Sequence, residues 1–373
     1  MERYQKKAIL RDLQKKMVLL AGPRQSGKTT LAKVIEKEFA SSIYLTYDHL
    51  EDRKIIIEES WLPETELIIL DEIHKMPQWK NFLKGVYDTK PKHQKILVTG
   101  SARLEIFNQV GDSLAGRYFL HRLMPLSPAE CKKVQTPYTI DHFLERGGFP
   151  EPFLVDRLVD ANRWRLQYVD SLLRTDVLDF ETIYNLNAIR LVFELLRERV
   201  GSPVSYSSIA EDVSISPNTV RKYMQILEAL YIIFRVTPYS HNIARSLIKE
   251  PKIYFFDTGL VKGDKGIKFE NFVATCLLKH VHAKIDYFAE SYSLHYLQTK
   301  ERQEVDFALT KDHHIESMIE VKFANHTIGR GMLYFFKKYQ FPSYQIVKEL
   351  KREKIENGIK IVKADNFLKN LEL

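Results

Sequence analysis

The sequence predicts an α/β protein that begins with a parallel sheet covered by helices on both faces. Four short apolar runs, at 17–22, 43–47, 67–70 and 96–99, alternate with helical patterns in its first third. Continuous apolar strands that alternate with helices are typical of a parallel sheet buried on both sides. Helical spacing then dominates, and strand-like runs return only after residue 252. We therefore expect a helical part with a winged helix next, and a small α/β domain at the end.

The length of the chain, 373 residues, is too great for one ordinary hydrophobic core. The changes in pattern predict the following boundaries: an α/β core at 1–126, a helical lid or linker at 127–185, a winged helix at 186–245 and a small α/β domain at 246–373.

The composition favours a soluble protein with an anionic partner. The formal net charge is +8, and nucleic acid is the commonest partner of a basic protein. The two cysteines, Cys131 and Cys276, are far apart and in no motif, which indicates a reducing cytoplasm. The N-terminal stretch is charged and no run of eighteen apolar residues occurs, so we expect neither a signal peptide nor a membrane span.

The segment GPRQSGKTT fits the P-loop pattern G-x-x-x-x-G-K-[ST] between a strand and a helix. Its glycines let backbone N–H groups face a phosphate, and the helix points its positive end at the same anion. Lys28 is expected to reach the β- and γ-phosphates of ATP, and the Thr29 hydroxyl to bind Mg²⁺. The predicted nucleotide-binding residues are Gly22, Pro23, Arg24, Gln25, Ser26, Gly27, Lys28, Thr29 and Thr30.

The ends of two later strands supply the other expected catalytic groups. In LIILDE, Asp71 is expected to hold Mg²⁺ through water, and Glu72 to polarise the attacking water; the alternative is that both only cap the next helix. In ILVTGSAR, Ser101 is expected to orient that water, unless it is a simple turn or N-cap residue. Arg117, with Arg122 as a weaker candidate, fits an arginine finger; the alternative is a surface salt bridge.

The segment 204–236 has the pattern of a helix, a turn, a second helix and a strand, as in a winged helix. Ser216 is placed to cap the second helix, with Pro217 at its first position. Arg221 and Lys222 face away from the apolar stripe of that helix, where a recognition helix meets DNA. We expect contacts to DNA phosphates more than base reading, and the alternative is a module that only packs against protein.

Three acids and a lysine near the C-terminus resemble a nuclease site. Glu270 lies in a helical stretch, Asp306 in the strand-like EVDF, and Glu320 and Lys322 in the strand-like EVK. Residues two apart on a strand share a face, so these groups can converge and bind Mg²⁺. Two alternatives stay open: a nuclease-like fold that binds without cutting, and a plain salt-bridged strand pair.

Many ordered motifs resemble one family over almost the whole chain. They are GPRQSGKTT, LDEIHKMPQWK, VTGSAR, SLAGR, PLSPAE, GGFPE, LLRTDV, YFFDTGL, FENFV, EVDF and EVK. With these motifs the chain resembles the prokaryotic ATPases of the AAA+ superfamily that carry a winged helix and a C-terminal PD-(D/E)XK nuclease-like domain. The resemblance implies a homo-oligomer, with a hexameric ring as one form, in which Arg117 acts on a neighbouring subunit.

Two functions are compatible with these motifs and this composition. The first is an ATP-hydrolysing protein that remodels or translocates DNA, with metal-dependent cleavage as a further activity. The second is a nucleotide-switched signalling or scaffold protein whose nuclease-like domain is inactive.

Overall fold

The computed structural model describes residues 3–100, 114–176, 185–240, 250–324 and 327–373. The chain forms two compact units, Met1–Met124 and Pro125–Leu373. Among the helices in the described ranges, none combines the length and apolar character that crossing a bilayer requires.

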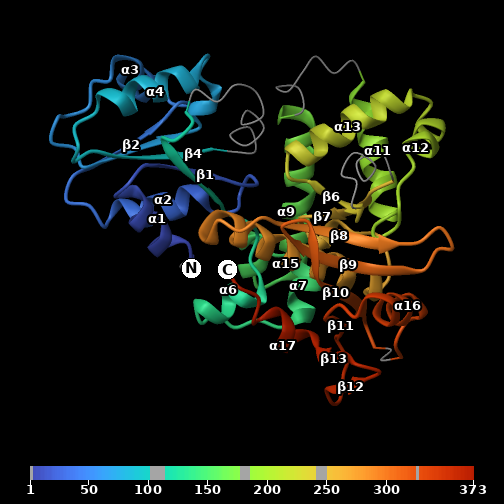
Figure 1. The fold of residues 1–373 in the computed structure, drawn as a ribbon. Helices are drawn as coiled ribbons and strands as arrows, with labels where there is room; N and C mark the ends of the chain where they lie inside the picture. The colour runs from blue at the N-terminus through green and yellow to red at the C-terminus, as the bar shows by residue number, and fades with distance from the viewer. Residues whose placement is uncertain (1–2, 101–113, 177–184, 241–249, 325–326) are drawn as a thin grey trace. The chain divides into compact units, whose positions relative to one another are not determined.

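The first unit is a five-stranded parallel sheet with helices on both faces (Figure 1). In spatial order its strands are β2 (Ser42–Thr46), β3 (Leu67–Asp71), β4 (Lys95–Thr99), β1 (Met17–Ala21) and β5 (Tyr118–Arg122). The helices are α1 (Lys6–Leu13), α2 (Lys28–Glu36), α3 (Leu50–Glu58) and α4 (Trp79–Thr89), with a 3₁₀ turn η1 (Ile73–Lys75). The predicted parallel sheet is confirmed.

Each face of this sheet has its own core. Along β3, Ile68 and Leu70 pack toward α3 and α4, while Leu67 and Ile69 pack toward α1 and α2. All residues of β1 and β3 are buried, as the unbroken apolar runs predict. The P-loop therefore follows one fully buried strand, β1, and the strand-end acid Asp71 is the last residue of another, β3.

Strand β5 is absent from the sequence-based prediction. Its residues YFLHR include a histidine and an arginine, and most of them are only partly buried. The strand lies at the edge of the sheet and pairs with a neighbour, β1, on one side only. An edge strand of this kind has no clear hydrophobic pattern to detect.

The second unit begins with helices and ends with a mixed eight-stranded sheet. The first helices are α6 (Pro128–Lys133), α7 (Ile140–Arg146), α8 (Pro150–Leu154) and α9 (Leu158–Ser171), and α9 continues into a π-helical turn, η3 (Leu172–Asp176). Next come α11 (Leu186–Glu198), α12 (Tyr206–Val213) and α13 (Pro217–Ala229). Ser216 caps α13 through its hydroxyl, and Pro217 is the first residue of that helix, as expected.

The strand order in this sheet is β12, β13, β11, β10, β9, β8, β6, β7. The strands are β6 (Ile233–Pro238), β7 (Lys252–Phe255), β8 (Tyr292–Gln298), β9 (Glu304–Lys311), β10 (His314–Lys322), β11 (Ser343–Val347), β12 (Lys354–Glu356) and β13 (Ile359–Lys363). The remaining elements are η4 (Thr258–Leu260), α15 (Lys265–Phe288), α16 (Arg330–Tyr339) and α17 (Ala364–Leu368).

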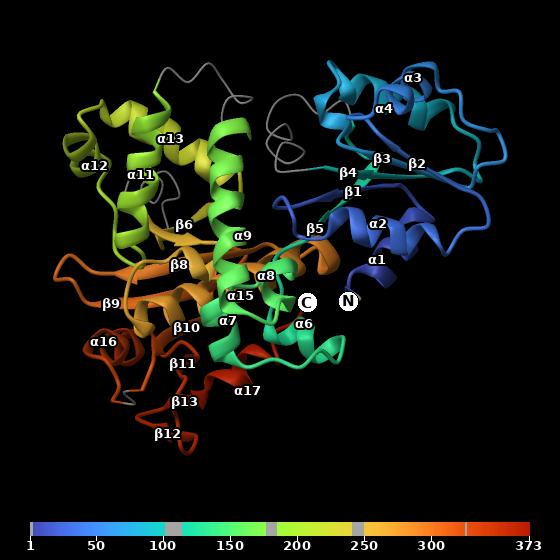
Figure 2. The same ribbon diagram turned by 180° about the vertical axis from the view of Figure 1, so that it is seen from behind.

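The antiparallel pair β6–β7 joins the two halves of this unit. Helices α11, α12 and α13 lie together on one side of β6 and β8 (Figure 2). Strand β6 also pairs in parallel with β8, through Thr237 and His295, so the pair continues the C-terminal sheet. This pairing places side chains of β7 near those of α15 and β9.

Candidate nucleotide site and C-terminal acid cluster

The P-loop leaves β1 at Ala21 and enters α2 at Lys28. Gly22 and Gly27 have φ angles of 144° and 94°, which favour glycine. A Cβ atom on Gly22 would lie 2.5 Å from the carbonyl oxygen of Leu123. The tight curl expected from the glycine spacing is therefore present, and Gly22 is needed for both its φ angle and its small size.

Lys28 lies inside this loop. Its Nζ donates to the carbonyl oxygens of Gly22 at 3.0 Å and Pro23 at 2.6 Å. Burial lowers the pKa of Lys28 to about 8, although the carboxylates of Glu72 and Asp71 act in the opposite direction. The ammonium group is thus held at the loop by backbone carbonyls, which phosphate oxygens can replace.

Asp71 and Thr29 bring the P-loop helix and β3 together. Thr29 Oγ1 donates to Asp71 Oδ2 at 3.3 Å. A hydroxyl and a carboxylate at this separation offer the hard oxygen donors that Mg²⁺ prefers. The residues present therefore fit the predicted role of Thr29 and Asp71 in holding Mg²⁺.

Two residues that the sequence reasoning missed fix the carboxylate of Asp71. The hydroxyl of Tyr44 on β2 donates to Oδ2, and the hydroxyl of Thr99 on β4 donates to Oδ1. Thr99 pairs with Asp71 in the strand register and is fully buried. Thr99 could have been found from the sequence, because it is a polar residue at the end of the apolar run 96–99.

Glu72 lies just beyond the strand, with a φ angle of 56°. Its backbone N–H donates to the carbonyl oxygen of Thr99 at 2.9 Å, and its side chain lies 3.5 Å from His74 Nε2. Burial, and then the charge of Asp71, raise the pKa of the Glu72 carboxyl, which makes it a better proton acceptor. Its side chain makes no capping hydrogen bond to η1. The role of Glu72 in activating water remains a prediction.

Arg3 is a second contact that the sequence reasoning missed. One guanidinium nitrogen donates to the carbonyl oxygen of Ser26 at 2.6 Å, and another donates to that of Met124 at 2.6 Å. The side chain is buried and ties the P-loop to the last residue of the first unit. A single arginine in a charged N-terminal stretch gives no sequence signal for this contact.

The other predicted catalytic residues differ in where the structure places them. Ser101 is outside the described residues. Arg117 precedes β5 and forms an ion pair with Asp88, with N–O distances of 2.8 and 2.9 Å. Its backbone bonds to Met17 at the start of β1, so five strand residues, roughly 17 Å, separate it from the P-loop of its own chain. Its action on a neighbouring subunit remains a prediction. Arg122 pairs with Ala21 at the P-loop end.

The lowered pKa of Lys28 predicts a pH dependence for nucleotide binding. The ammonium is charged at about pH 7, and it loses its proton as the pH rises through about 8. Phosphate binding favours the charged form, so binding above this pH requires uptake of a proton. We expect the affinity for Mg-ATP to be nearly constant from about pH 7 to 7.5, and to fall toward about tenfold per unit above pH 8. Fluorescence anisotropy of a labelled ATP analogue measures the affinity at each pH. An affinity that stays unchanged up to about pH 9.5 would contradict this prediction.

The four predicted nuclease residues gather in the second unit. Glu270 lies on α15, Asp306 on β9, and Glu320 and Lys322 on β10. Asp306 Oδ2 accepts a hydrogen bond from the backbone N–H of Val321, and Lys322 Nζ lies 2.8 Å from Glu320 Oε1. The charge of Asp306 contributes to raising the pKa values of both Glu270 and Glu320, after burial. We call the four neighbouring acids the acid cluster: Glu270, Glu304, Asp306 and Glu320.

A buried lysine from β7 enters this cluster, which the sequence reasoning did not anticipate. Lys252 Nζ lies 2.6 Å from Glu304 Oε1 and 3.9 Å from Glu270 Oε1. The Tyr254 hydroxyl, from the same strand, donates to Glu270 Oε1 at 2.8 Å. Across the described part of the chain, no three acidic, histidine or cysteine side chains are arranged to hold a metal ion. Binding of Mg²⁺ by these acids remains a prediction.

The candidate DNA-binding residues lie on the outer side of α13. Arg221 and Lys222 are exposed, whereas Val220, Tyr223 and Met224 are buried. The predicted orientation of the apolar stripe is confirmed, and DNA binding itself remains a prediction.

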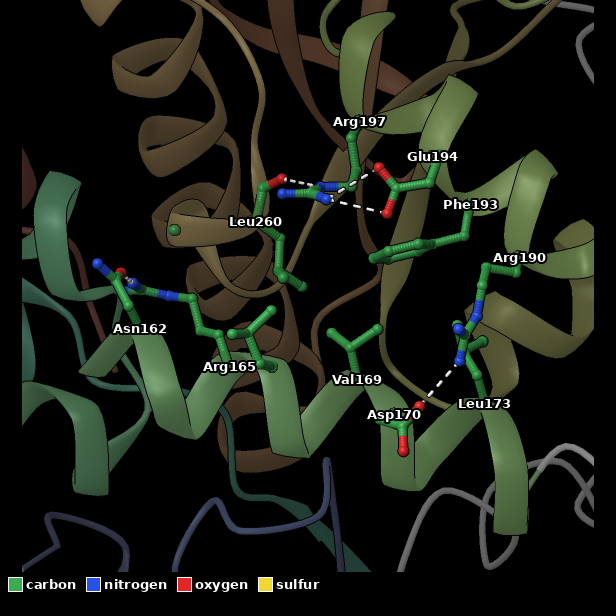
Figure 3. Close-up of a pocket in the computed structure, with 12 residues that line it drawn as sticks. Asn162, Arg165, Val169, Asp170, Leu173, Arg190, Phe193, Glu194, Arg197 and Leu260 are labelled. Carbon is green, nitrogen blue, oxygen red and sulfur yellow. Dashed lines mark hydrogen bonds and ion pairs between the residues drawn. The ribbon is translucent and has the colours of Figure 1, made fainter. Parts of the chain in front are cut away.

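The second unit also contains a cavity of about 390 Å³ between α9, α11 and η4 (Figure 3). Apolar side chains such as Val169 and Phe193 face it, with arginines at its rim. Arg197 donates to the carbonyl oxygen of Leu260 at 2.6 Å and to Glu194 at 3.0 Å, and Arg190 donates to Asp170 at 2.8 Å. Each of these arginines thus has an acid beside it.

Comparisons with known proteins agree with the P-loop geometry. Residues 14–132 match the AAA domain family. The AAA domain is followed by two domains of unknown function: residues 138–268 match DUF8612 and residues 265–367 match DUF4143. The first part of the chain thus resembles the AAA domain, whose ATPases typically use ATP and Mg²⁺.

Relatives of known sequence do not extend this assignment. An uncharacterized protein of Mycobacterium tuberculosis is 28% identical over 254 residues, covering 67% of this chain and 56% of that protein. An uncharacterized protein of Methanocaldococcus jannaschii is 25% identical over 346 residues, covering 81% of this chain and 75% of that protein. The chain thus matches little more than half the length of the mycobacterial relative.

Two solved structures resemble the chain weakly. The Walker-type ATPase of Pyrococcus abyssi has a TM-score of 0.45 and 14% identity, covering 69% of this chain and 94% of that one. A RuvB variant of Thermotoga maritima has a TM-score of 0.34 and 17% identity, covering 62% of this chain and 88% of that one. Both TM-scores are too low to bear on the function of this chain.

Proposed function

We propose that this chain hydrolyses ATP at the P-loop, Asp71 and Glu72, and uses the energy to remodel DNA or move along it. The observation that carries the ATPase part is the hydrogen bond from Thr29 to Asp71, which joins the P-loop helix to a strand-end acid. This contact brings a magnesium-binding hydroxyl, a carboxylate and the buried ammonium of Lys28 into one site.

Each side chain has a separate role in this proposal. The backbone N–H groups of residues 24–30 and the Lys28 ammonium bind the triphosphate and stabilise its charge. Thr29 and Asp71 hold Mg²⁺, which neutralises charge on the phosphates when bound. Tyr44 and Thr99 fix the orientation of Asp71, and Glu72 accepts a proton from the attacking water.

The DNA part of the proposal depends on charge and on α13. The net charge of +8 favours a polyanionic partner. Asn218, Arg221, Lys222 and Gln225 are exposed at spacings of three and four residues, so they share one face of the helix. Three helices followed by the antiparallel pair β6–β7 fit a winged helix, whose recognition helix would be α13.

The same proposal includes a homo-oligomer. Arg117 lies at the amino-terminal end of β1, and the P-loop follows the carboxyl-terminal end of that strand. Arg117 would therefore serve as an arginine finger for another copy of the chain. Asp88 would have to release the guanidinium group when subunits assemble.

Charge reversal on α13 tests the role of DNA. The double variant Arg221→Glu/Lys222→Glu is expected to keep the basal ATPase rate and to lose stimulation by DNA. The salt dependence of DNA binding should also become weaker, because the phosphate contacts of both residues are lost. The ATPase rate is measured at fixed low salt with single-stranded, duplex and branched DNA.

The matched control is Lys337→Glu/Lys338→Glu, an exposed pair on α16 with the same change in charge. If DNA stimulates the ATPase rate of the α13 variant as strongly as that of this control, α13 is excluded as the DNA-binding helix. A wild-type rate that does not respond to DNA, with no salt-sensitive DNA binding, would exclude the whole DNA part.

A second candidate is a nucleotide-switched scaffold whose nuclease-like domain does not cut. The buried ammonium of Lys252 among the acids favours this candidate, since cleavage would need Mg²⁺ in the same place. The scaffold predicts slow ATP turnover, assembly that depends on ATP, and no effect of the α13 variant. Light scattering with and without ATP distinguishes it from the first candidate.

A further inference from the structure

We infer that Lys252 is the resident cation of the acid cluster, which holds the chain's own ammonium group in place of a divalent metal ion. This role belongs to the second unit alone and is independent of ATP hydrolysis and of DNA binding. Neither the motif nor the spacing of the acids indicates it.

The backbone of Lys252 is fixed from two sides, which limits where its side chain can go. Lys252 pairs with Val236 on β6 and forms an isolated bridge with Pro203. Its side chain is 1% exposed, and Nζ lies 5.4 Å from the ring centre of Tyr296. The ammonium is therefore directed into the cluster by the strand and does not reach it from a flexible loop.

The ammonium occupies the space among these acids that a metal ion would need. Lys252 Nζ lies 2.6 Å from Glu304 Oε1 and 3.9 Å from Glu270 Oε1. Mg²⁺ binds oxygen at about 2.0–2.1 Å and Ca²⁺ at about 2.3–2.6 Å, usually with six or more ligands. Acids spread around Lys252 at these distances cannot close on a metal while the ammonium is present.

The neighbouring carboxylates compensate the buried charge of the ammonium. Glu304 and Glu270 lie on the side of the cluster that Lys252 Nζ enters. A buried ammonium without such partners would be strongly unfavourable. The burial of the Lys252 ammonium therefore depends on the neighbouring acids, and the burial of those acids depends on the ammonium.

One carboxylate oxygen of the acid cluster has no hydrogen-bond partner among the described residues and could bind a further cation. Glu320 is 6% exposed, and its Oε2 atom is buried without a hydrogen-bond partner among the described residues. The ion pair with Lys322 uses the other oxygen, Oε1, at 2.8 Å. Removal of the Lys252 ammonium would leave Glu270 and Glu304 without this cation, and carboxylate oxygens of this kind favour Mg²⁺ or Mn²⁺.

The test is Mn²⁺ binding by the full nucleotide-free chain, measured by electron paramagnetic resonance. The wild type is compared with Lys252→Met, which has a similar length and no charge. A control is Lys279→Met, because Lys279 is 2% exposed and forms a buried ion pair with Glu130, outside the acid cluster. The single variant Asp306→Asn reports whether any wild-type site uses the cluster, and the double variant Lys252→Met/Asp306→Asn reports whether any new site does.

We expect Lys252→Met to bind one Mn²⁺ per chain at least about tenfold more tightly than the wild type and Lys279→Met. The added site should be lost in the double variant, and Mn²⁺ should raise the melting temperature of Lys252→Met alone. If Lys252→Met folds only when Mn²⁺ is supplied, the metal has replaced the ammonium and the inference is supported.

Three outcomes would overturn the inference. The first is a wild-type Mn²⁺ site that Asp306→Asn removes, because a metal would then share the cluster with Lys252. The second is a folded Lys252→Met that binds Mn²⁺ no better than the wild type. The third is a Lys252→Met variant that Mn²⁺ fails to restore to the folded state.

Discussion

Glu72→Gln is expected to bind Mg-ATP with unchanged affinity and to hydrolyse it about 10²–10⁴-fold more slowly than the wild type. Glutamine keeps the size and polarity of the side chain but cannot accept a proton. Glu72 lies beyond the end of β3, and its carboxyl has a raised pKa because of burial and of Asp71. A carboxylate of increased basicity suits the removal of a proton from water.

The measurement is the release of phosphate in a single turnover, with nucleotide affinity determined separately. Glu64→Gln is a suitable control, because Glu64 is an exposed residue just before β3. A Glu72→Gln rate within about threefold of the wild type would show that another group activates the water. The affinity of Glu72→Gln for Mg-ATP should equal that of the wild type, because Glu72 contributes to hydrolysis and not to phosphate binding in this proposal.

Lys28→Met is expected to lower the affinity for Mg-ATP by about 100-fold, roughly 3 kcal/mol. Methionine fills the space of the lysine side chain but cannot donate to phosphate oxygens. In the nucleotide-free protein Lys28 Nζ donates only to the carbonyl oxygens of Gly22 and Pro23 among the hydrogen bonds of the described residues. The loss should therefore come from nucleotide binding more than from folding.

Lys37→Met provides the matched control, because Lys37 is exposed at the C-terminal end of the same helix. The fall in affinity above about pH 8 should also vanish in Lys28→Met, since no ammonium remains to lose its proton. Unchanged affinity in Lys28→Met, in a protein with a normal melting temperature, would refute the assignment of Lys28.

The part of the site that lies within single motifs could be predicted from the sequence. The P-loop glycines, Lys28 and Thr29 form one contiguous loop, and LIILDE marks a strand end by its own pattern. Parallel strands end at the same edge of a sheet, so the two motifs had to meet. The hydrogen bond between Thr29 and Asp71 is the result of that topology.

Contacts between distant strands could not be predicted in this way. Tyr44 reaches Asp71 because β2 lies beside β3, and Lys252 reaches the acids because β6 pairs with β8. Apolar periodicity reports which face of a strand is buried, but it does not report which strand is its neighbour. For the same reason the acids alone suggested a metal site, while the ammonium that enters it comes from another part of the sheet.

In the proposed function, the P-loop and its strand-end acid form a working Mg-ATP site. The most direct measurement is an isothermal titration of Mg-ATP into the nucleotide-free wild-type chain, alongside Asp71→Asn. One binding site per chain, with a clear loss of affinity in Asp71→Asn, is the expected result. A wild-type chain that is folded but shows no affinity for Mg-ATP would contradict the claim.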